Sequence, residues 1–495
     1  MGMLALLGFA MIAAGQDHPA ARAAREYRMS HERAIVDEFL SLLAIPNVAS
    51  HAGDIARNVE HLQHLLAHRR IESQVLEVPN APPVLYAEIR TPGATRTLMF
   101  YAHIDGQPVE PAQWQGSKPF TPVLKDRGGR VIALPEKFDP ESRIYARSAS
   151  DDKAPVMAML AALDAMKAKG LALRSNLKFF FDGEEEAGSP NLRRYLEQYR
   201  DKLGADAWIF CDGPVHQSRK QQVVMGVRGV VGLNLTLYGA KRELHSGHYG
   251  NWAPNPLMMA AQLMASMRNE DGRILIPGFY DDVEPLSESE KQAVRNAPDI
   301  DAELKEELGL VRTEGNGKRI EELVNLPALN FRGMQAAGVG AQSRNVVPAS
   351  TTISIDVRLV KGMDPQRVVD KFRQHLASQG YHVVTQEPDD AIRRKHPRIC
   401  RLDAREGGYK AVRASMDLPI SKEVIAAVKA ARGDIVVLPT MGGSLPIAPI
   451  AEAFDKPVII VPIANHDNNQ HGHNENIRIQ NLWDGIETLA ALLNL

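Results

Sequence analysis

The sequence predicts an α/β protein in which a largely parallel sheet flanked by helices carries an inserted α+β domain. Two observations support this prediction. Short continuous apolar runs lie between helical stretches, which is typical of buried parallel strands covered on both faces. These runs are residues 98–102, 177–181, 208–211, 435–438 and 458–461. By contrast, "GVVGLNLTLYG" and "TTISIDVRLV" alternate apolar and polar residues, which indicates half-exposed antiparallel strands in a second domain.

Composition and charge exclude several classes of protein. The 495 residues are 44% hydrophobic and 24% charged, as in an ordinary soluble globular protein of two or three domains. The formal net charge of −2 gives no basic field for nucleic acid or an anionic membrane, so a small or neutral partner is expected. Only Cys211 and Cys400 occur, which excludes a disulfide scaffold and an all-thiolate metal site.

The N-terminus has the pattern of a targeting segment. An apolar stretch from Met3 to Ala14 is followed by small and then polar residues, so residues 1–16 resemble a secretory signal peptide. The stretch is too short to span a bilayer, and no later segment is apolar enough to do so. The protein is expected to be secreted or periplasmic if this leader is cleaved, and cytoplasmic otherwise.

Metal-ligating residue types follow most of the predicted buried strands. They are His103 and Asp105, then Glu184, Glu185 and Glu186, then Asp212, and finally the histidines of "PIANHDNNQHGHNE". The carboxyl ends of parallel strands meet in one crevice, and His, Asp and Glu are the ligands of zinc and manganese. The three glutamates alone would also suit a solvated turn. The coincidence of acidic ends on several strands favours a metal site.

A further pair of carboxylates precedes a predicted helix. In "SASDDKAPVMAMLAALDAMKAKG" the apolar residues recur at helical spacing, with Pro155 near the start and Asp151 or Asp152 placed to cap it. An ordinary capped helix explains one of these aspartates and leaves the other without a role.

Eight motifs in order resemble the aminoacylase, carnosinase and bacterial glutamate carboxypeptidase family of co-catalytic metallopeptidases. They are "AHIDGQP", "SDDKAPV", "GEEEAGS", "CDGP", "RELHSGHYGN", "SRNVVPAS…DVR", "MGGSLP" and "HGHNENI", and together they span nearly all of the chain after the leader. The dipeptidase and carnosinase branch is the most similar, through "DDKAPV", "IPGFYDDV" and "RELHSGHYGN". The alternating pattern between 226 and 406 predicts an α+β domain inserted between two parts of a catalytic domain, 26–225 and 407–495, and the resemblance implies that the inserted domain is a lid and dimerisation domain.

The resemblance also implies two divalent metal ions per subunit, most often zinc, with manganese or cobalt as alternatives. Asp151 would bridge the ions, His103 and Asp212 would complete one site, and Glu186 and His471 would complete the other. 

Asp105 would orient His103, and Glu185 would be the general base on a metal-bridging water or hydroxide. This assignment rests on the pattern Glu185-Glu186-Ala187-Gly188, in which Glu184 has no role and a slip of one residue would exchange the others.

In the inserted domain the resemblance assigns residues that act on the substrate. His245 would stabilise the oxyanion from across a homodimer, and Asn345 and Arg358 would help to hold the substrate. Backbone N–H groups of the loop containing Gly443 and Ser444 would receive its terminal carboxylate. The fork of donors on Arg358 suits a carboxylate, although a surface charge on an exposed sheet face would also explain this residue.

The chain departs from the family pattern at Ala146, Ser148 and Ala154, where glycine is usual; these changes surround a peptide bond, Asp151-Asp152, that is commonly cis in the family. The ligand set is nevertheless complete.

The expected activity is a metal-dependent exopeptidase acting on dipeptides or short peptides with a free C-terminal carboxylate. An N-acyl-amino-acid deacylase would use the same site. More remote alternatives are a two-metal phosphoesterase and a non-catalytic metal-binding protein. In a non-catalytic protein, Glu185 or one of the ligands would be expected to be missing.

Overall fold

The computed structural model describes residues 18–405 and 408–495, and the chain divides into two compact units. The first contains the described residues up to 224 together with 414–437 and 449–495, and the second contains 225–413 and 438–448. The second unit therefore takes a segment, 438–448, that was not expected in it from the sequence. The leader expected at 1–16 and the domain boundary expected at 406/407 lie outside the described residues.

An eight-stranded sheet forms the centre of the first unit, in the order β1-β2-β7-β3-β8-β20-β9-β19. The strands are β1 (Glu72–Leu76), β2 (Val84–Ile89), β3 (Thr97–His103), β7 (Asn176–Asp182), β8 (Ala207–Phe210), β9 (Gln222–Val224), β19 (Val436–Leu438) and β20 (Val458–Ile460). The neighbours β7, β3, β8 and β20 are parallel, as predicted, whereas β1, β2 and β9 pair antiparallel. The run at 435–438 becomes the edge strand β19, so it is only partly buried.

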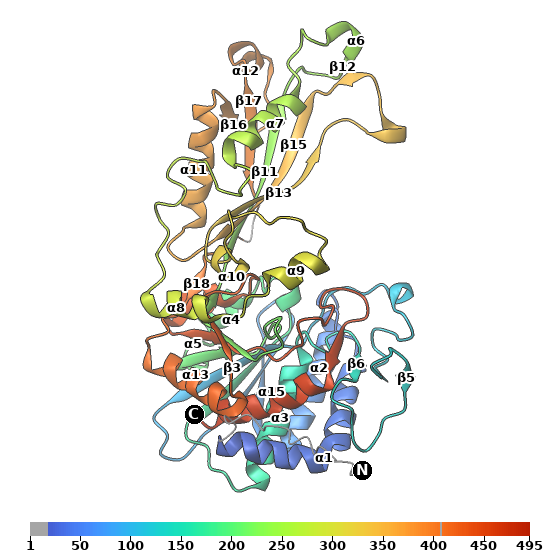
Figure 1. Cartoon of the computed structure of the whole chain (residues 1–495), viewed down its shortest axis with the longest axis vertical. Helices are drawn as coiled ribbons and strands as arrows, with labels where there is room; N and C mark the ends of the chain where they lie inside the picture. Colours follow the sequence, from blue (N-terminus) through green and yellow to red (C-terminus); the bar gives the residue numbers. More distant parts are fainter. Residues whose placement is uncertain (1–17, 406–407) are drawn as a thin grey trace, which may run out of the picture. The chain divides into compact units, whose positions relative to one another are not determined.

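Helices of the first unit pack on one another as well as on the sheet. They are α1 (Pro19–Leu43), α2 (Ala52–His68), α3 (Lys153–Ala168), α4 (Leu192–Gln198), α5 (Arg200–Leu203), α13 (Pro419–Arg432), α14 (Ile447–Phe454, which crosses into the second unit) and α15 (Ile479–Leu493), with short 3-10 helices η1 (Pro111–Gln113) and η2 (Glu185–Ala187). Helices α1, α3 and α15 contact one another, and α13 packs on α15 (Figure 1). This explains why α3 and α15 are buried on nearly every side. A second sheet has the order β21-β6-β4-β5, formed by β4 (Val123–Lys125), β5 (Val131–Ile132), β6 (Arg143–Tyr145) and β21 (Asn476–Arg478).

The second unit is built on a five-stranded sheet in the order β13-β15-β11-β17-β16. Its strands are β11 (Gly229–Tyr238), β13 (Ala328–Gln335), β15 (Ser350–Leu359), β16 (His382–Val384) and β17 (Ile399–Ala404). All neighbours are antiparallel except β16 and β17. The inward side chains of β11 and β15 share one core with α7 (Pro256–Met267) and α11 (Pro365–Ser378). The predicted alternation of these strands is confirmed, since Leu233, Leu235 and Leu237 are fully buried.

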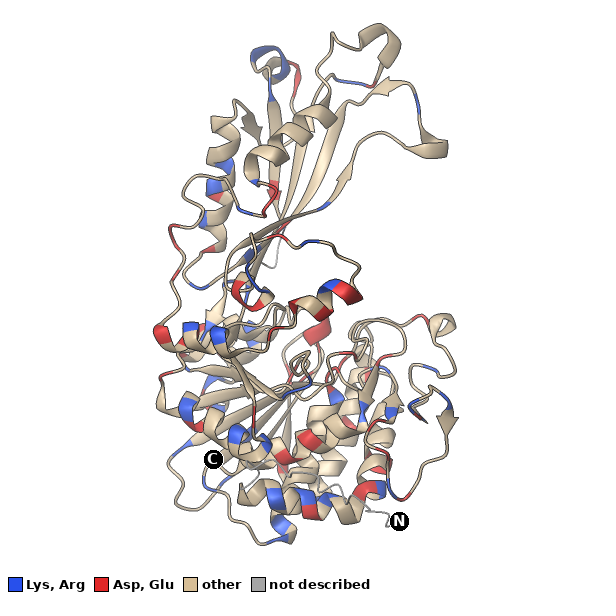
Figure 2. Cartoon of the chain, in the orientation of Figure 1, with Lys and Arg blue, Asp and Glu red and all other residues tan. Residues whose placement is uncertain are grey.

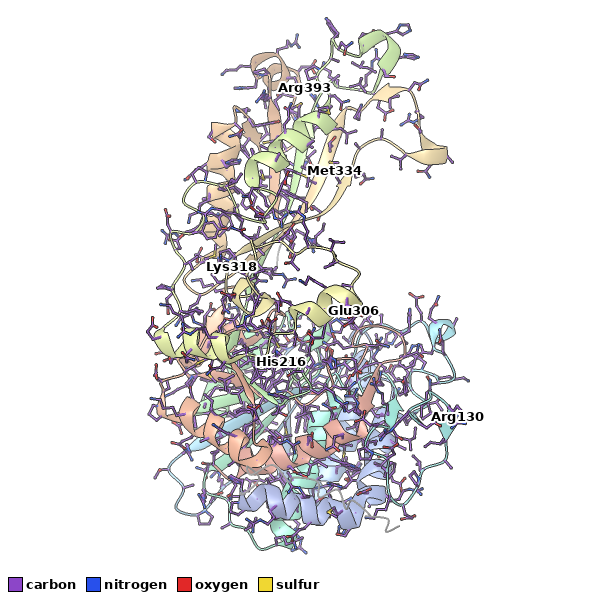
Figure 3. The ribbon with its side chains drawn as sticks, in the orientation of Figure 1. Arg130, His216, Glu306, Lys318, Met334 and Arg393 are labelled. Atoms are coloured by element: carbon purple, nitrogen blue, oxygen red, sulfur yellow. The ribbon has the colours of Figure 1, made fainter. Side chains whose placement is uncertain are left out.

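Shorter elements complete the second unit. They are β10 (Gly226–Val227), β12 (Leu244–His245), α6 (Ser246–Tyr249), α8 (Glu288–Asn296), α9 (Asp301–Glu307), α10 (Ile320–Leu323), η3 (Gly340–Gln342), β14 (Val346–Val347), α12 (Asp390–Lys395) and β18 (Val412–Arg413). Arg393, labelled in Figure 3, belongs to α12. Its guanidinium lies over the ring of Tyr238, 5.5 Å from the ring centre, and donates to the Gly239 carbonyl. Charged side chains concentrate on helices and loops, and the strands carry few (Figure 2). Among the described residues, no helix is long and apolar enough to cross a membrane.

Candidate metal centre

Three adjacent parallel strands deliver the first site residues. Strand β3 ends at His103, its neighbour β7 ends just before the glutamates, and β8, on the other side of β3, is followed by Asp212. Because the carboxyl ends of these strands meet at one edge of the sheet, residues distant in sequence come together there. Asp151 joins them from the segment that precedes α3, and His471 joins them from the loop before β21.

The five predicted ligands form two groups that share Asp151. His103 Nε2 lies 2.8 Å from Asp151 Oδ1 and 3.9 Å from Asp212 Oδ2. His471 Nε2 lies 3.1 Å from Asp151 Oδ2 and 3.3 Å from Glu186 Oε2. In each group, one ligand atom from every residue lies within 4.8 Å of the others. The two oxygens of Asp151 thus face different histidines, as a ligand shared between two ions would.

The electrostatics of the cluster favour cations. Burial, reinforced by the charge of Asp151, raises the pKa of Glu186 to about 8 and that of Asp212 to about 7. Burial opposes ionisation of Asp151 as well, but hydrogen bonds from His103 and His471 lower its pKa. A divalent ion would offset the repulsion among these carboxylates. The set of imidazole and carboxylate donors fits zinc or manganese.

The three consecutive glutamates have different surroundings. Glu184 is buried and accepts hydrogen bonds from Asn191 N and Nδ2 at 2.7 and 3.0 Å, which turns it away from the cluster. Glu186 accepts from Gln107 Nε2 at 2.8 Å and faces His471. Glu185 belongs to neither ligand group, and burial raises its pKa. These positions are compatible with the expected register of base and ligand, whose catalytic roles stay predictions.

Asp105 connects the first histidine to the glutamate turn. Its Oδ1 lies 3.2 Å from His103 Nδ1. The same carboxylate accepts hydrogen bonds from the backbone N–H groups of Glu185 and Glu186, at 3.1 and 2.9 Å. A single buried carboxylate can therefore orient the ring of His103 and fix the start of η2.

Two of the three departures from the family pattern, Ala146 and Ser148, lie in the segment before α3, and the third, Ala154, lies in the first turn of this helix. The Asp151-Asp152 peptide bond is cis, as expected. Neither aspartate caps α3 through its side chain, so that prediction was wrong; Asp152 instead accepts from the backbone N–H of His103 at 3.2 Å. Ser148 has a φ of 60°, the left-handed region that favours glycine. Its Oγ accepts from Asn47 Nδ2 at 2.8 Å, so the hydroxyl is integrated into the loop.

The remaining predicted residues lie in the second unit. Arg358 on β15 donates to Ser444 Oγ at 2.9 Å and to Asp356 at 3.0 Å. His245 and Asn345 are exposed near the β12–β14 pair, and Gly443 is exposed beside Ser444. The structure thus brings Arg358 and Ser444 together. The action of all five residues on a substrate stays a prediction.

Sequence reasoning missed two residues that support the cluster. Gln107 holds Glu186, and the buried carboxylate of Glu475 accepts the backbone N–H of Asp151 at 3.0 Å. Gln107 lies inside the motif "AHIDGQP" and Glu475 inside "HGHNENI". Their place in these motifs is the only indication in the sequence that they support the metal ligands.

Comparisons with known proteins agree with this architecture. Residues 99–495 match the model of a protein family described as "Peptidase family M20/M25/M40". It is 27% identical over 422 residues to the human Beta-Ala-His dipeptidase, covering 83% of this chain and 76% of that protein. It is 26% identical over 435 residues to a Cys-Gly metallodipeptidase of Saccharomyces cerevisiae, covering 86% and 84%. An M20 family metallo-carboxypeptidase from Sulfolobus solfataricus has a similar structure, with a TM-score of 0.74, 27% identity and coverage of 93% and 98%.

Proposed function

The chain belongs to peptidase family M20/M25/M40, and we propose that it hydrolyses the amide bond of dipeptides or short peptides with a free C-terminal carboxylate. The observation that carries this proposal is the pair of ligand groups sharing Asp151. Similarity to dipeptidases named for Beta-Ala-His and Cys-Gly substrates supports a small peptide rather than a protein as substrate.

Two divalent ions are proposed as cofactors, with zinc as the expected metal and manganese or cobalt as alternatives. His103, Asp151 and Asp212 would hold one ion, and Asp151, Glu186 and His471 would hold the other. When bound, such ions supply Lewis acidity to a substrate carbonyl and make water more acidic. The side chain of His471 is 55% exposed, whereas those of His103 and Asp212 are buried, so substrate and water can approach from the side of His471.

Glu185 is proposed as the group that moves the proton. It lies between two residues with other partners, Glu184 and Glu186, and takes no part in either ligand group. The raised pKa of its carboxyl group, caused first by burial, suits a group that accepts a proton from water and delivers it to the leaving amine. The hydrogen bond from its backbone N–H to Asp105 holds it beside the cluster.

Residues of the second unit are proposed to recognise the substrate. Arg358 is oriented by Asp356 and Ser444, which presents its guanidinium in a fixed direction for a carboxylate. Asn345 and the loop of Gly443 and Ser444 would add further donors. The resemblance to the family supports the oxyanion role of His245 and its supply across a homodimer. Export after cleavage of residues 1–16 also stays a proposal.

Product analysis by mass spectrometry tests the function. The protein loaded with zinc or manganese is offered a mixed panel of dipeptides, tripeptides, N-acyl amino acids and a phosphomonoester. Cleavage of free dipeptides, lost in Glu185→Gln and retained in the matched control Glu184→Gln, is expected. Cleavage confined to the acylated amino acids would replace the proposal with a deacylase, and cleavage of the phosphomonoester alone would replace it with a phosphoesterase.

A further inference from the structure

Glu475 is a fully buried carboxylate that belongs to neither ligand group. It lies four residues after His471, immediately before β21, and none of its surface is exposed. Burying an ionised carboxylate costs free energy unless hydrogen bonds or a counter-charge compensate. Its partners therefore indicate what it does in the fold.

All five donors to this carboxylate come from one short segment, residues 147–151. Oε2 accepts from Arg147 Nη1 at 2.8 Å and from Ser148 N at 2.9 Å. Oε1 accepts from Ser150 N, Ser150 Oγ and Asp151 N, each at 3.0 Å. Three of the donors are backbone N–H groups, so the carboxylate fixes the path of the main chain up to Asp151. Hydrogen bonds to an ionised acceptor are about twice as strong as neutral ones.

The segment that Glu475 holds has little regular structure of its own. Ser148 has a φ of 60°, and His471 and Asn474, in the loop of Glu475, have φ values of 63° and 58°. Non-glycine residues persist in this region when the surrounding structure holds them there. The backbone bond from Ala146 N to Glu475 O, 3.2 Å long, adds to the side-chain contacts.

We propose that Glu475 is a positioning residue that holds Asp151 and His471 in register for the two ions. The side chain of Glu475 accepts a hydrogen bond from the backbone N–H of Asp151, and Glu475 itself is separated from His471 by only three residues in the sequence. The two segments are more than 300 residues apart in sequence, and the neighbouring pair Asn476 and Tyr145 continues their contact as the β21–β6 ladder. This inference rests on the proposed metal site and adds a residue that no ligand pattern identifies.

Glu475→Gln is the direct test, because glutamine keeps the size of the side chain and replaces one acceptor oxygen with an NH₂ group that faces backbone donors. Zinc affinity is measured by competition with a chromogenic chelator, and kinetics are measured at saturating metal. A loss of about 10- to 100-fold in metal affinity is expected, the range found when a partner behind a metal ligand is removed. The kcat for dipeptides should fall while KM changes little.

Two further variants separate positioning from general stability. Ser150→Ala removes one of the five donors and should weaken metal binding by about 2- to 12-fold, the value of one hydrogen bond. Glu487→Gln is the matched control, since Glu487 is another buried glutamate whose partners, Arg25 and Arg432, lie on helices outside the ligand segments. It should lower the thermal midpoint without changing metal affinity.

The outcomes distinguish this inference from the proposed function. If the wild-type protein binds no metal, the proposed function fails. If it binds two ions and Glu475→Gln binds them with unchanged affinity, the positioning role is overturned while the function stands. Should Glu475→Gln not fold, an unchanged affinity in Ser150→Ala overturns the role. An equal loss of affinity in Glu487→Gln overturns it as well.

Discussion

Replacing Gly106 with alanine tests how firmly Ser148 is held in the segment 147–151, which ends at the proposed ligand Asp151. A Cβ at position 106 would lie 2.6 Å from Ser148 Oγ, and its next neighbours, Arg147 Cδ and Cγ, would be at 3.2 Å. The serine hydroxyl has little freedom to retreat, because Asn47 Nδ2 donates to it at 2.8 Å and it donates to the Asp105 carbonyl at 3.3 Å. The backbone of Gly106 is fixed too, since its N–H donates to the Asn47 carbonyl at 2.8 Å.

The magnitude follows from these contacts. Overpacking of this kind costs about 1–3 kcal/mol of unfolding free energy. In a Ser148→Gly background the contact at 2.6 Å is gone, and the remaining contacts at 3.2 Å need a shift of only a few tenths of an ångström, so the cost of Gly106→Ala should fall below about 1 kcal/mol. The two substitutions should therefore couple by about 1–2 kcal/mol. Ser148→Gly alone should change the unfolding free energy by no more than about 1 kcal/mol, because it loses two hydrogen bonds of about 1 kcal/mol each and relieves a left-handed residue that costs about 1–2 kcal/mol.

Urea denaturation of the wild-type protein, both single variants and the double variant, all without metal, measures this coupling. Gly53→Ala is the matched control, because nothing lies within 4 Å of the Cβ it would add; it should not couple to Ser148→Gly. Effects of Gly106→Ala and Ser148→Gly that add within about 0.5 kcal/mol would refute the reasoning.

Three further predictions concern charge. Zinc binding near neutral pH should release protons, because Glu186, with a pKa of about 8, must lose its proton to become a ligand. Calorimetry in buffers of different ionisation enthalpy should show that fewer protons are released at about pH 8.5 than at about pH 6.5. Equal proton release at the two pH values would contradict the prediction. Burial alone would raise the pKa of Asp467, but hydrogen bonds from Asn465 and Arg143 lower it to about 2. The contribution of ionised Asp467 to stability is thus present above about pH 4 and is lost as the pH falls toward 2. Because the side chain is 38% exposed, Asp467→Asn should lower the unfolding free energy by only about 1 kcal/mol at pH 7. A loss that persists at about pH 2 in chemical denaturation would contradict an origin in the charge of Asp467. Lys153 donates to the carbonyl of Leu42, at the end of α1, and to that of Ile45, just after the helix. Lys153→Met should therefore lower the unfolding free energy by about 1–3 kcal/mol, whereas an unchanged urea midpoint would show that these bonds contribute nothing.

The sequence predicts best those features that depend on local periodicity. Alternation placed Leu233 and Leu235 in the core of the second unit, and the apolar runs located the parallel strands whose ends carry His103 and Asp212. Because parallel strands present their carboxyl ends at one edge, the convergence of His103, Asp212 and the glutamates could be predicted, whereas Asp151 and His471 come from loops and were assigned by the family resemblance.

Features that depend on long-range partners were not predictable in the same way. Asp152 has the position of a helix cap, but the backbone N–H of His103 competes successfully for its carboxylate. Glu475 accepts from a segment more than 300 residues away, and nothing in its own neighbourhood in the sequence indicates that partner. The antiparallel edges of the main sheet likewise depend on pairings that periodicity does not specify.

The most direct test of the account is the metal content of the loaded protein, measured by mass spectrometry for the wild type, Glu185→Gln and Glu186→Gln. We expect two ions per chain in the wild type and in Glu185→Gln, with kcat for dipeptides at least about 100-fold lower in that variant, and weakened binding of one ion in Glu186→Gln. A wild-type protein without bound metal would contradict the account, as would a Glu185→Gln variant that loses an ion while Glu186→Gln retains both.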